Sequence, residues 1–227
     1  MTTKKTTSGN APLEEPYLKG KNALYLWSFV GMNVAVFLSL VVSRHFSSSS
    51  IAQSWGRVTA KNGIIAVSIP LLTVVLSGVL DDITKARLVF WRWRHPLPGN
   101  RVFSELVSTD PRIDQRALKA AVGKLPRAPL EQNALWYRLY KKHKMVRSVW
   151  ESHKIYLLTR DMSAIAAMCG VLFSIGLAVT GGGWLISLIY TVILGVQYLL
   201  IARSARNYGD RFVLNVICEE SSVQLHQ

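Results

Sequence analysis

The chain has 227 residues, of which half are hydrophobic, and its 27 Lys and Arg against 13 Asp and Glu give a formal net charge of +14. Its mean hydropathy of +0.23 and its four uncharged apolar stretches exclude a single soluble domain, because a short chain cannot bury four such helices away from lipid. Each stretch has about the 20 residues that a helix needs to cross the hydrocarbon core of a bilayer. The sequence therefore predicts an all-α membrane protein with four transmembrane helices, over residues 23–42, 63–80, 162–180 and 184–202.

The N-terminal part of the chain divides into a tail and a hairpin. Residues 1–20 are rich in Thr, Ser and Lys and show no hydrophobic period, so we expect a disordered tail. The first two spans follow as a transmembrane hairpin over residues 21–82. In the first span, small residues recur every four positions, a spacing that lets transmembrane helices approach closely. These residues are Gly31, Ala35 and Ser39.

A basic segment separates the two pairs of spans. Between residues 81 and 160 the chain has seventeen Lys and Arg against seven Asp and Glu. Positively charged segments next to spans stay in the cytoplasm. We therefore expect a small helical cytoplasmic insert over residues 83–160, with both chain termini also on the cytoplasmic side of the membrane. Anionic lipid headgroups are the default partner of such a surface, and a cytoplasmic protein or nucleoprotein is the further partner that we expect.

The start of this insert alternates aromatic and cationic residues. Trp91 and Trp93 are interleaved with Arg92 and Arg94. Indole rings of this kind lie at headgroup depth while the cations reach outward into water. The four residues therefore predict an interfacial anchor.

A heptad pattern follows Pro129. No glycine or further proline interrupts the chain before Gly170, so the sequence predicts one long helix that enters the bilayer near Arg160. Along it, seven residues follow one another at spacings of three and four, which places them on one face. We expect this seam to support homo-oligomerisation, with packing inside the subunit as the alternative. Its members are Trp136, Leu139, His143, Val146, Trp150, His153 and Leu157.

The last two spans are joined only by three glycines, 181–183, which predict a tight antiparallel hairpin over residues 161–203. Each span again carries small residues four apart, and we expect these faces to allow close helix packing. They are Ala166, Gly170 and Ser174 in the third span and Ser187, Thr191 and Gly195 in the fourth. Residues 204–227 mix polar and apolar side chains, and we expect a cytoplasmic C-terminal tail.

Two short patterns approach known catalytic motifs. The stretch from Asp82 to Arg87 resembles the start of the CDP-alcohol phosphotransferase signature, but Asn100 and Ser104 stand where that family places further aspartates to hold two metals. Arg138 and His143 have the spacing seen in HEPN ribonucleases, which a basic helix satisfies easily by chance. We therefore predict that the protein is not an enzyme and has no catalytic residues, metal or cofactor.

Two other classes are disfavoured. Cys169 and Cys218 lie in a span and after the last span, and they form no disulfide framework or metal-binding spacing. No span carries an ionisable residue in its middle, whereas proton pumps and secondary transporters normally need one.

The layout of few spans around a small basic insert without a catalytic motif resembles the small transmembrane effectors of bacterial anti-phage defence systems, including those encoded beside retrons and nucleotide-signalling enzymes. The resemblance implies a non-enzymatic effector that oligomerises and perturbs or permeabilises the inner membrane once infection is sensed. It also implies a partner that keeps the effector inactive until then. The alternatives are a scaffold or assembly subunit that docks a cytoplasmic partner or anionic lipid through the insert, and a membrane-bound enzyme that acts on lipid or nucleic acid.

Overall fold

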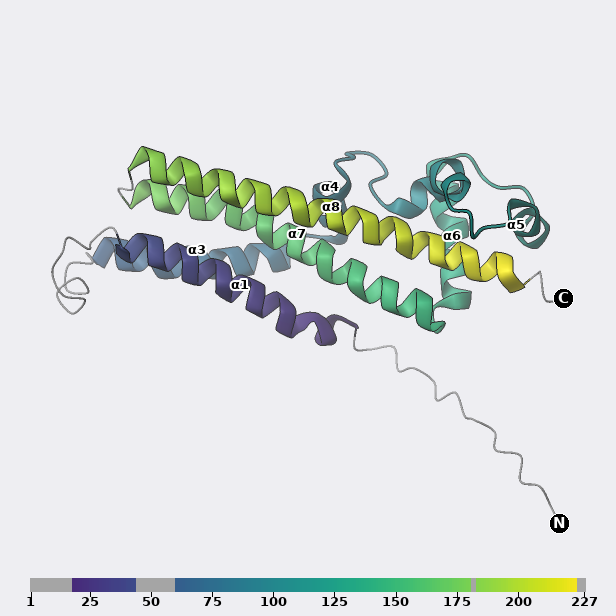
Figure 1. The fold of residues 1–227 in the computed structure, drawn as a ribbon, viewed down its shortest axis with the longest axis horizontal. Helices are drawn as coiled ribbons and strands as arrows, with labels where there is room; N and C mark the ends of the chain where they lie inside the picture. Colours follow the sequence, from purple (N-terminus) through teal and green to yellow (C-terminus); the bar gives the residue numbers. More distant parts are fainter. Residues whose placement is uncertain (1–17, 44–59, 181–182, 224–227) are drawn as a thin grey trace, which may run out of the picture.

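The computed structural model describes residues 18–43, 60–180 and 183–223, and these are almost entirely helical, with no strand among them (Figure 1). Four long helices lie side by side along the longest axis of the molecule. Shorter helices gather around the C-terminal half of the last one. The long helices are α1 (Leu18–Ser43), α3 (Ala60–Val79), α7 (Arg147–Val179) and α8 (Trp184–Val223).

Three of these helices are long and apolar enough to cross a membrane, over Asn22–Val42, Arg147–Val179 and Trp184–Ser222. In α3 the apolar stretch is shorter, Ala66–Val75. Large apolar side chains stay exposed on the outside of the spans, among them Ile193 and Leu200 of α8, as expected for surfaces that face lipid. The prediction of an all-α fold is therefore confirmed for the described residues, and three helices have the length and apolar composition that a membrane span needs, while the count of four spans stays a prediction.

One hydrophobic core holds the apolar parts of the long helices together. Phe37 of α1 and Phe173 of α7 are completely buried, and their rings stack with centroids 4.7 Å apart. They come together because Gly176 of α7 has no side chain. A Cβ at that position would lie 3.1 Å from Phe37 Cζ and would collide with the Ile69 side chain of α3. Gly176 is thus the contact point of three helices.

A second core lies at the other end of α7 and α8, where the basic insert wraps around the C-terminal half of α8. In this half, side chains three or four positions apart are almost completely buried, from Ala205 through Phe212 and Val213 to Ile217. The predicted C-terminal tail is therefore wrong as far as residue 223. The helix of the last span does not end near residue 203. It continues to Val223 as one 40-residue helix, because its amphipathic second half is the central element of this core.

The insert itself is built from α4, a run of tight turns, and two further helices. The Asp81 carboxylate caps α4 by accepting a hydrogen bond from the Thr84 backbone N–H at 3.0 Å. The Asp114 carboxylate caps α5 by accepting hydrogen bonds from the backbone N–H groups of the second and third residues of that helix. Gly123 ends α5 at a φ of +76°. The elements are α4 (Asp82–Phe90), η2 (Pro98–Arg101), η3 (Val102–Leu106), η4 (Val107–Thr109), α5 (Gln115–Val122) and α6 (Pro129–His143).

The single long helix predicted after Pro129 is also wrong. The helix breaks between His143 and Arg147, where Val146 adopts an extended backbone with φ −70° and ψ 132°. The break lets α6 turn across α7 and α8 while α7 runs alongside α8 (Figure 1). Packing of α6 against α8 outweighs the local preference for an unbroken helix, because most helical stability in proteins comes from tertiary contacts.

The predicted segments at the chain ends fall partly outside the described residues. Of the expected N-terminal tail, residues 1–17 lie outside them, and α1 begins at Leu18. Residues 181–182 of the glycine connection and residues 224–227 also lie outside the described part.

Candidate functional site

The first three seam residues lie inside the subunit. Trp136, Leu139 and His143 on α6 are each less than a tenth exposed and face α8. The indole N–H of Trp136 donates to the Val213 carbonyl at 3.3 Å, and its ring meets that of Phe212 edge to face. The predicted continuous seam is therefore broken after its third member, and these side chains pack within the chain.

The other seam residues also contact their own chain. Val146 packs against the second core, and Trp150 and Leu157 on α7 are partly buried. His153 stacks on the Phe212 ring with centroids 4.5 Å apart, and its Nδ1 lies 3.1 Å from the Tyr140 hydroxyl. The heptad spacing thus marks the face on which α6 and α7 receive α8, and homo-oligomerisation stays a prediction.

A buried ionic contact ties α6 to the C-terminal end of α8. Glu220 is 4% exposed, and its carboxylate lies 2.5 Å from Nε2 of His143 and 2.9 Å from Nζ of Lys142. Sequence reasoning missed Glu220, because its partners are 77 and 78 residues away and the segment was taken for a tail. The His143 side chain is therefore held against a carboxylate inside the domain.

A second buried polar contact organises the turns before α5. The side chain of Gln132, which is 1% exposed, accepts the backbone N–H groups of Phe103 and Ser104 at 3.0 and 3.1 Å and donates to the Arg127 carbonyl at 2.8 Å. These are backbone groups that the irregular turn cannot satisfy itself. The Gln132 side chain therefore supplies the hydrogen-bond acceptor that the backbone N–H groups at the start of η3 lack within the helix.

The acidic pair at the start of α4 is used for structure. Asp82 lies 3.0 Å from the buried guanidinium of Arg160, which also contacts Asp161, and Lys85 pairs with Asp161 at 3.3 Å. This cluster joins α4 to α7 just before the apolar part of α7 begins. Hydrogen bonds from Thr84 lower the pKa of the neighbouring Asp81. In the described part of the chain, no group of three His, Cys, Asp or Glu is placed to hold a metal ion.

The four residues of the predicted anchor follow directly after the end of α4. Trp91 is the C-cap of α4, and its ring lies under the Arg206 guanidinium of α8 at 3.8 Å. Arg92 forms a two-bond ion pair with Glu105, Trp93 is 83% exposed, and Arg94 is exposed. The structure therefore places two large, accessible indole rings beside cations, where α4 meets α8.

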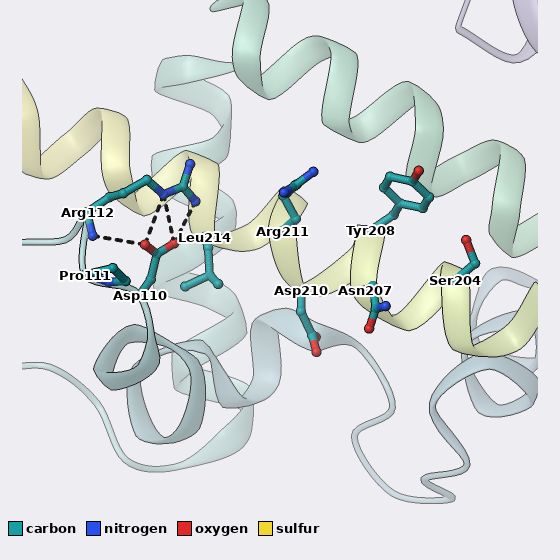
Figure 2. Close-up of a pocket in the computed structure, with 9 residues that line it drawn as sticks. All are labelled: Asp110, Pro111, Arg112, Ser204, Asn207, Tyr208, Asp210, Arg211 and Leu214. Atoms are coloured by element: carbon teal, nitrogen blue, oxygen red, sulfur yellow. Dashed lines mark hydrogen bonds and ion pairs between the residues drawn. The ribbon is translucent and has the colours of Figure 1, made fainter.

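A cleft with a volume of about 760 Å³ lies on α8 just beyond its apolar half (Figure 2). At one end, Arg112 turns onto Asp110 with a closest contact of 2.6 Å, and this bond lowers the pKa of Asp110 and raises that of Arg112. The cleft is lined by Asp110, Pro111, Arg112, Ser204, Asn207, Tyr208, Asp210, Arg211 and Leu214.

The chemistry of this cleft is that of a polar binding surface. It contains no histidine or cysteine, Asp110 is held by Arg112, and Asp210 is held by Arg101. A nucleophile with an adjacent general base, the minimum for covalent catalysis, is therefore absent from its lining.

The small residues of the spans differ in how far they are buried inside the chain. Ala166 is completely buried inside the chain. A Cβ added to Gly31, Gly170 or Gly195 would meet nothing within 4 Å, so these glycines leave open space. Ala35, Ser39 and Thr191 are exposed. Ser174 and Ser187 are partly buried, and their hydroxyls find no hydrogen-bond partner among the described residues. The close approaches are instead at Gly176 and at Gly209, where no small-residue triplet was predicted.

Comparisons with protein-family models, with curated proteins and with solved structures find no match to this chain. The long helices α7 and α8 pack against each other along their apolar halves. Their other halves enter the helical domain, which is built around α8.

Proposed function

We propose that the chain is a four-span protein of the bacterial inner membrane, with both termini and the helical domain in the cytoplasm. The apolar helices α1, α7 and α8 support three crossings. The fourth, α3, has 20 residues, which is enough to span the hydrocarbon core. The excess of Lys and Arg between residues 81 and 160 supports the cytoplasmic side for the domain.

Cysteine labelling tests this topology. In a chain with Cys169→Ala and Cys218→Ala, we expect a new cysteine at Ser48, between α1 and α3, to react in intact spheroplasts with a membrane-impermeant maleimide. A new cysteine at the exposed Lys141 of α6 should react only after lysis. If α3 does not cross the membrane, the two positions lie on the same side and react alike, which would contradict the proposal.

Within this topology, the protein acts as a non-enzymatic effector that perturbs or permeabilises the membrane when the helical domain is triggered, as in antiviral defence. One observation carries this function. Both α7 and α8 continue from their apolar halves into the core of the helical domain without a break. At 1.5 Å per residue they are about 50 and 60 Å long. A shift of the domain therefore moves the spans as well.

The outer faces of the spans support assembly of several copies. Gly31, Ala35 and Ser39 lie exposed on one face of α1, and Gly170 leaves space on α7. Small residues of this kind allow close contact between transmembrane helices of neighbouring subunits. We propose that these faces meet in the active assembly.

Membrane potential after induction in a bacterial host tests the effector function. We expect expression of this chain to depolarise cells, as read with a voltage-sensitive dye. The variants Gly31→Leu and Gly170→Leu should abolish depolarisation, because leucine fits the single chain but blocks close packing between chains. Gly78→Leu is the matched control, since it also meets nothing within 4 Å and lies outside the small-residue triplets. Ala166→Leu is not suitable, because Ala166 is buried in the subunit core.

The other outcomes of that experiment are equally informative. Depolarisation that survives both glycine variants would show that packing on these faces is not the mechanism. An unchanged potential, with the protein recovered from the membrane fraction, would favour a scaffold that docks a partner. The exposed cations of α6, Arg138, Lys141 and Lys142, favour this second function.

A further inference from the structure

A pocket of about 370 Å³ lies where α4 meets α8, away from the cleft of Figure 2. Thr84, Arg87 and Leu88 line it from one face of α4, and Tyr198 lines it from α8. Tyr198 belongs to the uncharged apolar run 184–202, and the next two residues of that run, Leu199 and Leu200, are exposed. The pocket therefore lies at the level where the apolar surface of α8 gives way to charged residues.

One wall of the pocket is held in an unfavourable conformation. Trp91 has φ 54° and ψ 32°, a left-handed geometry that is rare for a bulky residue. The surroundings hold it there. Its indole N–H donates to the Tyr198 hydroxyl at 3.0 Å, the Tyr198 hydroxyl donates to the Leu88 carbonyl at 2.8 Å, and Arg206 covers the ring. Such strain persists only where neighbouring contacts enforce it, and it gathers at ligand sites.

The charged side chains that line the pocket are two arginines, Arg87 and Arg92. Arg87 uses only Nε, which donates to the Trp93 carbonyl at 3.3 Å, and its two terminal nitrogens have no partner among the described residues. Arg92 is paired with Glu105. Arg206, which lies behind Trp91 and outside the lining, has one buried terminal nitrogen without a partner among the described residues. The two carboxylates that interact with the lining arginines, Asp81 and Glu105, are not themselves in the lining, so the site favours an anion at the terminal nitrogens of Arg87.

We propose that this pocket binds an anionic phospholipid. The headgroup phosphate binds at Arg87, and the glycerol and upper acyl chain lie along Leu88, Trp93 and Tyr198. A bidentate guanidinium matches phosphate geometry, and an indole that is 83% exposed, as Trp93 is, suits the headgroup region. The proposal rests on the proposed placement of α8 in the membrane and does not need the effector activity.

The occupant is a lipid because of what surrounds the charge. A soluble phosphate needs only donors, whereas this pocket combines its arginines with two indoles, a leucine and a tyrosine. The apolar walls continue into the exposed apolar surface of α8, which faces acyl chains in the proposed membrane placement. A lipid satisfies both halves of the pocket at once.

Native mass spectrometry of the full chain in detergent tests the site. We expect added phosphatidylglycerol to be retained about tenfold more tightly than phosphatidylcholine, because the choline of phosphatidylcholine places a positive charge beside the phosphate that Arg87 binds and weakens its attraction to the arginines. Arg87→Gln should remove this preference. Arg94→Gln, an exposed arginine of the same segment that does not line the pocket, should keep it. Trp93→Ala serves as a second variant, because truncation of so exposed a side chain leaves the fold intact.

Three results would overturn the proposal. Equal losses in Arg87→Gln and Arg94→Gln would mean that the basic surface attracts lipid without a defined site. Equal retention of the two lipids would mean that the headgroup is not recognised. Competition by soluble glycerol 1-phosphate, at the concentration at which phosphatidylglycerol binds, would identify a free phosphate as the ligand. All three are measured on purified protein, so failure of the depolarisation experiment does not decide them.

Discussion

Replacing Gly209 with leucine should prevent the helical domain from packing on α8. A Cβ at this position would lie 2.8 Å from Phe90 Cζ of α4 and 2.9 Å from Tyr156 Cε2 of α7. Both rings are almost completely buried and have no free space to move into. Overpacking of a tight core costs up to about 3 kcal/mol, or more when backbones must separate. We expect a clear loss of thermal stability in detergent and rapid proteolysis of the insert.

The matched control is Gly195→Leu on the same helix. A Cβ at Gly195 meets nothing within 4 Å, and leucine also has a better helix propensity than glycine by roughly 1 kcal/mol. The control should therefore unfold at the same temperature as the parent chain or slightly above it. If the two variants are equally stable, α4 and α7 do not approach α8 at Gly209 as the structure shows.

The sequence predicts the membrane-crossing elements well because their signal is local. An uncharged apolar run of about 20 residues needs no partner to be recognised. This property identified α1, α7 and α8 from composition alone. In the structure α1 runs parallel to α7, with Asn22 beside Lys154 and Phe37 stacked on Phe173, while α8 runs antiparallel to α7. The same local reasoning failed where the run ended. In α8 the chain becomes amphipathic after Ala202, and its hydrophobic face was assigned to a tail because the elements that cover it lie some 70 to 130 residues earlier.

The seam shows a different limit of sequence reasoning. Its periodicity is real, since Trp136, Leu139 and His143 do share one buried face of α6. The spacing of the seam residues shows which face of a helix is buried, but not which element buries it. The covering element is α8 of the same chain, and the helix breaks at Val146 to permit that contact. No proline or glycine marks the break, so only the tertiary structure reveals it.

The sequence drew attention to some residues of the pocket between α4 and α8, but not to the pocket itself. Alternation of Trp and Arg after α4 suggested an interfacial segment. The partners that turn this segment into a pocket, Tyr198 and Arg206, are more than 100 residues away in the chain. Their contacts with Trp91 depend on its left-handed backbone, which no sequence pattern announces. Long-range partners and unusual dihedral angles are thus the two things that composition could not supply.

Removal of the Glu220 carboxylate should be the most damaging single change to the polar contacts of the domain. Glu220→Ala leaves His143, which is 6% exposed, without its only strong partner and frees the Lys142 ammonium from α8. Breaking a buried pair on one side typically costs about 3 kcal/mol or more, because the remaining polar group stays buried and unpaired. We expect α6 to detach from the end of α8, seen as faster amide exchange in both helices and a lower unfolding temperature.

Two comparisons decide whether this loss comes from the pair itself. Glu219→Ala removes the neighbouring carboxylate, which accepts one hydrogen bond from Ser148 at 2.6 Å at the surface, and should cost about 1 kcal/mol or less. The double variant His143→Leu with Glu220→Leu should recover much of the stability lost in Glu220→Ala, because an apolar pair needs no partner charge. If Glu219→Ala is as damaging as Glu220→Ala, then α6 is held to α8 by its aromatic contacts alone. Recovery in the double variant would instead show that the buried charge fixes the position of α6, while the aromatic residues beside it supply most of the free energy of packing.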